Sequence, residues 1–92
     1  MIGKRVLVRF RNAGVHFGTL TQFGPDFLTL ENAKRLWSWV GAFTLSEISQ
    51  FGVRSARIAT EVPIMTFSTL DHCEIIPLTD EAAKSLDAQG AD

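Results

Sequence analysis

The 92-residue chain has only one cysteine, Cys73, and a formal net charge of only −1. A single thiol excludes an internal disulfide and any zinc site built from several cysteines. A net charge near zero argues against a general nucleic-acid binder, which needs positive charge to hold phosphates. We therefore expect no bound metal or cofactor, and RNA is not the favoured partner.

Long apolar runs are also missing. No stretch approaches the roughly 20 residues of a membrane-spanning helix, and the N-terminus lacks the apolar region of a secretion signal. We expect a soluble cytoplasmic protein with no membrane partner. The length leaves no room for a second core, which predicts a single domain, 1–92, with a frayed tail at 88–92. Because a domain this small buries a limited share of its surface, its seven Phe residues favour a homo-oligomer.

Arrangements that support catalysis are absent from the sequence. It has no cluster of metal ligands, no Gly-rich phosphate loop and no Cys–His pair with a third orienting group. His72 and Cys73 are adjacent in a predicted strand, where neighbours point to opposite faces, so they cannot act as base and nucleophile. We expect a buried structural thiol at Cys73 and no enzymatic activity.

Charge is distributed unevenly along the chain. Residues 1–60 hold eight of the nine Lys and Arg residues, whereas residues 61–92 hold seven of the ten acids. Such an asymmetry fits an anion-binding front half, a head-to-tail contact between subunits, or simple solvation of the C-terminal third. The sequence leaves these three interpretations open.

Alternation of apolar and polar residues predicts β-structure in much of the chain. Residues 4–11 place Val6, Val8 and Phe10 on one face and basic side chains on the other. Gly18, in the next predicted strand, indicates a bulge or a close approach of two backbones. Further segments are predicted as strands at 15–21, 27–31, 34–40, 61–67 (at a sheet edge because of Pro63) and 72–76, with an ordered connection at 53–60.

Two short helices are predicted, at about 44–51 and 79–87. Thr44 and Glu47 have the spacing of a capping box, and Gly52 suits the position that ends a helix. Thr79 precedes acidic residues in the same way at the second helix. The predicted fold class is mainly β (α+β): a compact twisted antiparallel sheet or small barrel of five to six short strands with two short helices.

The segment 34–40 carries the least common chemistry of the chain. In a regular strand, Arg35, Trp37 and Trp39 would share one face, because strand side chains alternate. A guanidinium beside two indoles forms either a hydrophobic clamp or a surface for flat anions. Stacking of a base on an aromatic ring contributes about 1–3 kcal/mol, and arginine can donate two parallel hydrogen bonds to a phosphate.

We therefore predict a binding site for a small nucleotide-derived ligand on this strand and the helix start that follows it. The two indoles would stack the base, the guanidinium would contact a phosphate, and nearby polar groups would fix the orientation. Its candidate residues are Arg35, Trp37, Trp39, Asn32, Thr44, Ser46, His16 and Arg54. Against this, Glu47 places a negative charge where an anion would sit, so a purely structural role for the indoles stays open.

An Sm-like RNA binder is a separate alternative. Residues 13–33, AGVHFGTLTQFGPDFLTLENA, loosely resemble the strand–turn–strand of Sm folds. The predicted helix after the Trp-containing strand does not match the N-terminal helix of Sm proteins, and RNA binding would favour more uniform positive charge. A structural part of a virion is also possible.

Three segments resemble a family of small phage and prophage proteins, most of them hypothetical. These segments are AGVHFGTL at 13–20, LENAKRLWSWVGAFTLSEIS at 30–49 and EIIPLTDEAAKSL at 74–86. The family patterns are AGVxxGxL, NARRLWxWxGAxxLSxL and EIxPCTxxA. Lys34 stands where a second arginine is common. Because lysine lacks the planar guanidinium of arginine, a bidentate contact with a phosphate is not favoured there. Leu78 stands where the family has cysteine.

The resemblance implies an accessory phage protein. By type, such a protein is similar to anti-defence proteins that sequester nucleotide signals, including those that counter Thoeris defence. The expected function is therefore a phage-encoded sponge, acting in the cytoplasm of the infected bacterial cell. It would bind a cyclic ADP-ribose isomer or a similar signal without chemistry.

Overall fold

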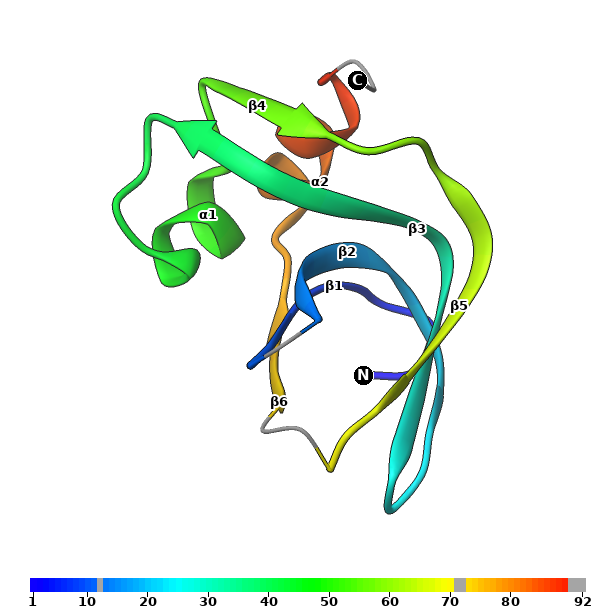
Figure 1. The fold of residues 1–92 in the computed structure, drawn as a ribbon. Helices are drawn as coiled ribbons and strands as arrows, with labels where there is room; N and C mark the ends of the chain where they lie inside the picture. The colour runs from blue at the N-terminus through cyan, green and yellow to red at the C-terminus, as the bar shows by residue number, and fades with distance from the viewer. Residues whose placement is uncertain (12, 71–72, 90–92) are drawn as a thin grey trace.

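The structure, a computed structural model, describes residues 1–11, 13–70 and 73–89. Its backbone forms one antiparallel six-stranded sheet and two short helices (Figure 1). The elements are β1 (Arg5–Phe10), β2 (Gly14–Phe23), β3 (Phe27–Val40), α1 (Leu45–Phe51), β4 (Ser55–Ile58), β5 (Val62–Ser68), β6 (Cys73–Pro77) and α2 (Asp80–Asp87). The strand order is β4-β3-β2-β1-β6, and β5 pairs with β3. The predicted fold class is confirmed in its open, twisted form.

β3 is one strand of 14 residues, where the sequence predicted two. Opposite Gly18, β3 carries one residue more than β2, which makes a β-bulge at Asn32. Asn32 has a φ of 52°, a left-handed conformation that asparagine tolerates better than most residues. A Cβ on Gly18 would lie 2.9 Å from the Glu31 carbonyl oxygen. The predicted close approach at Gly18 is therefore confirmed, and the predicted break at Asn32 is a bulge within a continuous strand.

β4 occupies part of residues 53–60, the segment that was predicted as an ordered connection or loop. It pairs with the C-terminal part of β3, and its last residue, Ile58, is fully buried. Only four residues long, β4 shows too little alternation for a sequence pattern to reveal it. β5 pairs with the N-terminal part of β3 and with no other described strand, which confirms the edge position that Pro63 indicated.

Apolar side chains fill both faces of the sheet. The inner core contains Val6, Val8, Phe10, Leu20, Leu28, Leu30, Ala33 and Phe67. The helix-side core lies on the opposite face, against α1 and α2, and contains Leu7, Phe17, Leu36, Leu45, Ile48, Val53, Ile58 and Leu86. The second face of β1, with Leu7 among its arginines, was predicted to be a basic outer face. That prediction is wrong at Leu7, which the helices cover completely.

The two helices lie together beside the C-terminal half of β3 (Figure 1). The predicted N-cap of α1 is confirmed, because the Thr44 hydroxyl accepts a hydrogen bond from the Glu47 N–H at 3.1 Å. The helical spacing of Leu45, Ile48 and Phe51 predicts a buried face that includes Phe51 and leaves Ser49 facing out, and both of these predictions are wrong. Ser49 is buried, and the Thr79 N–H donates to its carbonyl oxygen at 2.9 Å. Phe51 is exposed.

Among the described residues, ion pairs join cations of the first 60 residues to acids that follow them in the chain. They are Arg5–Asp87 at 2.8 Å, Lys34–Glu61 at 3.7 Å and Arg9–Glu74 at 3.9 Å. The Arg5–Asp87 pair is bidentate, with two parallel hydrogen bonds. The Arg5 guanidinium holds the pKa of Asp87 below its ordinary value of 3.8. Part of the positive charge of the first 60 residues is thus paired with the negative charge of the last third of the chain. An ion pair at the surface contributes about 0–1 kcal/mol to stability.

Ala88 and Gln89 remain hydrogen-bonded to the last turn of α2, whereas the rest of the predicted frayed tail, 90–92, lies outside the described residues. Asn12 and His72, the latter in the last predicted strand, also lie outside them. No helix in the described ranges is long and apolar enough to cross a membrane.

Gly52 ends α1 and lies against α2. The substitution Gly52→Ala should lower the free energy of unfolding by about 2 kcal/mol or more. Gly52 has φ 79° and ψ −154°, a region open essentially only to glycine, and strain there costs about 1–3 kcal/mol. An added Cβ would also lie 2.3 Å from the Ser85 Cβ. Chemical denaturation measures the loss.

Gly3→Ala is the matched control, because Gly3 has φ 85° but open space around its Cβ position. It should lose less stability than Gly52→Ala, since only backbone strain acts there. Equal losses in the two variants would contradict the close packing of Gly52 against α2.

Candidate functional site

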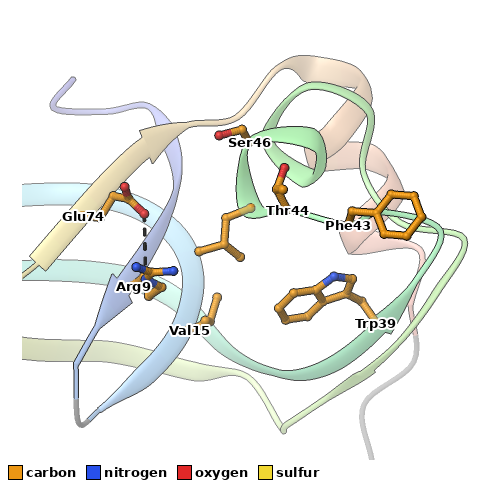
Figure 2. A pocket seen from close by; sticks show the side chains of 8 residues that line it. Arg9, Val15, Trp39, Phe43, Thr44, Ser46 and Glu74 are labelled. Carbon is orange, nitrogen blue, oxygen red and sulfur yellow. Dashed lines mark ion pairs between the residues drawn. The ribbon is translucent and has the colours of Figure 1, made fainter.

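A surface pocket of about 400 Å³ lies between the sheet and the start of α1 (Figure 2). Its lining contains Arg9, Val15, Trp39, Phe43, Thr44, Leu45, Ser46 and Glu74. Pockets that bind small molecules commonly have volumes of about 300–1,000 Å³. Three of the predicted site residues, Trp39, Thr44 and Ser46, meet here.

Strand register builds the floor of this pocket. Arg9 on β1 is directly opposite Glu74 on β6 and Val15 on β2. Residues directly opposite one another in antiparallel strands share a face of the sheet, so these three side chains form a row across three strands. Their face is the one that α1 and α2 cover, because Arg9 lies two residues from Leu7.

The wall of the pocket depends on a sharp turn after β3. Gly41 has φ 102°, and a Cβ there would lie 2.8 Å from the Arg54 Cβ, so glycine is required by conformation and by space. Trp39 donates its Nε1–H to the Ala42 carbonyl oxygen at 3.2 Å and packs against the helix-side core. The indole is therefore held in one position beside the cavity.

The two ends of the pocket differ in chemistry. Figure 2 shows Trp39 and Phe43 at one end and the Arg9–Glu74 pair at the other. The side chain of Phe43 is almost fully exposed, at 95%. Arg9 Nε is 3.9 Å from Glu74 Oε1, and both side chains are more than half exposed. Arg9 can therefore donate hydrogen bonds to a ligand from its remaining N–H groups.

Two hydroxyls lie between these ends. The Thr44 hydroxyl accepts from the Glu47 N–H, which leaves its own proton for a ligand acceptor. Ser46 is exposed on the first turn of α1. The Glu47 carboxylate, predicted to oppose an anion, does not line the pocket and accepts from the Phe43 N–H at 3.4 Å.

The predicted row of Arg35, Trp37 and Trp39 on one face is wrong. Between Leu36 and Ser38, β3 carries one residue more than β4, and this bulge shifts the alternation. Trp39 consequently packs on the same core as Leu36. Trp37 is 56% exposed away from the pocket, and the Arg35 guanidinium carbon lies 3.9 Å from its ring centroid.

The structure does not bring the other predicted residues to the pocket. His16 is 3% exposed in the inner core, with the Phe67 ring centroid at 4.6 Å. Its Nε2–H donates to the Ala13 carbonyl oxygen at 2.8 Å, and its Nδ1 is buried without a hydrogen-bond partner among the described residues. Asn32 and Arg54 are exposed and do not line the pocket.

Five lining residues were missed by sequence reasoning: Arg9, Val15, Phe43, Leu45 and Glu74. Phe43 and Leu45 adjoin the predicted Thr44 and could have been included for that reason. The other three are brought in by strand pairing, which no local pattern shows.

Metal binding and thiol chemistry find no support in residues 1–11, 13–70 and 73–89. No group of three or more His, Cys, Asp or Glu side chains there could hold a metal ion. Cys73 is half-buried rather than fully buried as predicted, and burial raises the pKa of its thiol. A raised pKa keeps the thiol protonated and unreactive.

The sequence model of one protein family, described as a domain of unknown function (DUF6948), matches residues 3–86. No curated protein and no solved structure matches the chain. The family description says nothing of phage origin or of Thoeris, so both remain predictions from the resemblance.

Burial of His16 predicts a dependence of stability on pH. Desolvation lowers the pKa of His16 from its ordinary 6.5, so the unfolded state takes up a proton at a higher pH than the folded state. Stability from this residue is complete above pH 6.5 and falls as the pH drops below that value. His16→Gln should therefore flatten the decline of the unfolding free energy below pH 6.5.

Denaturant titrations at several pH values provide this measurement. The quantity to compare is the slope of the unfolding free energy against pH, not the absolute free energy of unfolding. His72 is present in both proteins, so its titration cancels in the difference. Parallel pH profiles for the two proteins would show that His16 is not the group responsible.

Proposed function

We propose that this chain, a member of the DUF6948 family, binds a small nucleotide-derived ligand in the pocket beside α1 and does not alter it chemically. One observation carries the proposal: the 400 Å³ pocket places aromatic rings at one end and an accessible arginine at the other. A nucleotide has the same division, with a flat base at one end and a phosphate at the other.

The aromatic end suits the base. Trp39 is fixed by its hydrogen bond to Ala42, so little conformational freedom is lost when a base stacks on it. Phe43 is almost fully exposed, and a ligand that covers its ring would remove apolar surface from water. Stacking of this kind contributes about 1–3 kcal/mol per base.

The polar end suits the phosphate. Arg9 is exposed, and its ion pair with Glu74 is long, so its guanidinium can turn toward a phosphate. The hydroxyls of Thr44 and Ser46 would hydrogen-bond to the sugar or to the linking oxygens.

In its more specific form, the proposal is that the protein acts against bacterial defence by sequestering a nucleotide signal. The resemblance to phage proteins supplies this context, and a cyclic ADP-ribose isomer is the ligand expected from it. A homo-oligomer belongs to the same proposal, because large apolar side chains such as Phe23, Trp37 and Phe51 are exposed on the single chain.

Titration of a cyclic ADP-ribose isomer into the Trp37→Phe protein tests the proposal. Trp39 is then the only indole, so its fluorescence reports directly on the pocket. We expect saturable binding that Arg9→Gln weakens about tenfold, the loss of one charge-assisted contact. Trp39→Phe should also weaken binding when it is measured by calorimetry, whereas Trp37→Phe alone should not.

The ligand should be recovered unchanged after the protein is denatured by heat. Recovery of a cleaved product would show an enzyme. Binding of oligouridylate that strengthens with chain length and falls steeply with salt would favour the RNA-binding alternative. Binding that is insensitive to both Arg9→Gln and Trp39→Phe would place the ligand outside this pocket.

A further inference from the structure

We infer that Glu74 makes the pocket select ligands whose anionic group carries a single negative charge. The inference rests on the proposed function, since it concerns the ligand of the same pocket. It narrows the ligand class to flat molecules in which each phosphate is bridged on two sides and carries one charge, as in a phosphodiester or in the diphosphate bridge of a cyclic ADP-ribose isomer, and it disfavours a terminal phosphate.

The position of Glu74 is fixed by the sheet. It lies directly opposite Arg9 in the β1–β6 pairing, and among the described residues these two are the charged ones that line the pocket. Together they give the polar end one cation and one anion. An anion that reaches Arg9 also comes close to the Glu74 carboxylate.

The geometry of the pair sets how it responds to a ligand. At 3.9 Å between Arg9 Nε and Glu74 Oε1, with both side chains more than half exposed, the pair is weak and its partners are free to turn apart. Arg9 can turn to an incoming anion, whereas Glu74 has the shorter side chain, so its carboxylate moves less far from the pocket floor. Its charge continues to repel the ligand.

Repulsion discriminates between anions by their charge. A phosphodiester carries one negative charge near neutral pH, whereas a terminal phosphate carries nearly two because its second pKa is about 6. The second charge gains attraction from Arg9, but it meets added repulsion from Glu74 and gives up more hydration on entering the pocket, so it lowers the affinity. In addition, the Glu74 carboxylate can accept hydrogen bonds from N–H groups of a base, which favours uncharged donors over a second anionic oxygen.

The alternative role of Glu74 is structural, as a cross-strand partner that stabilises the pairing of β1 with β6. An exposed pair of this kind contributes little to stability. The two roles predict different outcomes when the carboxylate is replaced by an amide of the same shape. Loss of charge selection marks the first role, and a lower melting temperature without altered selection marks the second.

The experiment compares 3′,5′-cyclic AMP with AMP, which share the base, the ribose and one phosphate but differ by about one charge near neutral pH. Dissociation constants are measured by calorimetry for the full-length wild-type protein, Glu74→Gln and the control Glu31→Gln. Glu31 is an exposed acid on β3 that does not line this pocket.

For the wild type and Glu31→Gln we expect cyclic AMP to bind roughly threefold to tenfold more tightly than AMP, the effect of one added charge in a partly exposed site. Glu74→Gln should shift this ratio toward AMP by a similar factor, chiefly through tighter binding of AMP. Because the ratio is compared between proteins, differences in ligand shape cancel.

A ratio that Glu74→Gln leaves unchanged would overturn the inference, while binding that still depends on Arg9 and Trp39 would leave the proposed function standing. Failure of both nucleotides to bind all three proteins, when the cyclic ADP-ribose isomer binds, would also overturn it, since charge would then not be the property selected. Failure of all three ligands would remove the pocket proposal itself.

Discussion

The pairing of β3 with three other strands is the constraint on which the rest of the structure depends. One edge of β3 bonds to β2, and the other edge bonds to β5 along its first half and to β4 along its second. The pairing of this 14-residue strand with its partners does not keep a single regular register. β3 carries one extra residue relative to β2 at Asn32 and one extra residue relative to β4 at Trp37. Each extra residue changes which side chains face which core.

The bulge at Trp37 determines what can become a binding site. In a regular strand both indoles would lie on one face, and the pocket beside α1 would lose its aromatic wall. With the extra residue, Trp39 turns to the helix-side core, where α1 and the row from Glu74 to Val15 complete the cavity. Trp37 remains on the opposite side, stacked with Arg35. Backbone irregularity thus divides a local sequence motif between two surfaces.

Features set by near neighbours in the chain could be predicted from the sequence. The helix caps at Thr44 and Thr79 depend on residues three positions away, and the alternation of β1 follows from its own side chains. The close approach at Gly18 was also visible, because a glycine in a strand has few other reasons to be there. These features gave the fold class and the positions of both helices.

Features set by distant pairing could not be predicted. The shift of Trp39 to the helix side requires β4, whose four residues carry too little pattern to be recognised. The polar end of the pocket requires β6 to lie beside β1, which joins Arg9 to Glu74 from opposite ends of the chain. His16 was predicted to contact the ligand, whereas its face of β2 points into the inner core. Three of the eight predicted site residues therefore reached the pocket.

The two aromatic side chains that line the pocket differ in how firmly they are held. Trp39 is fixed, whereas Phe43 is exposed, and this difference affects how a ligand would bind. Trp39 is anchored to the turn at Ala42 and to the helix-side core, so stacking on it costs little conformational entropy. Phe43 lies almost entirely in solvent, and ordering its side chain would offset part of the gain from covering it. Affinity would thus come chiefly from Trp39 and Arg9, while Phe43 could adapt to ligands of different outline. If the proposed function holds, this pocket would recognise a class of flat anions by charge and by one stacking plane, and it would leave the far edge of the base loosely specified.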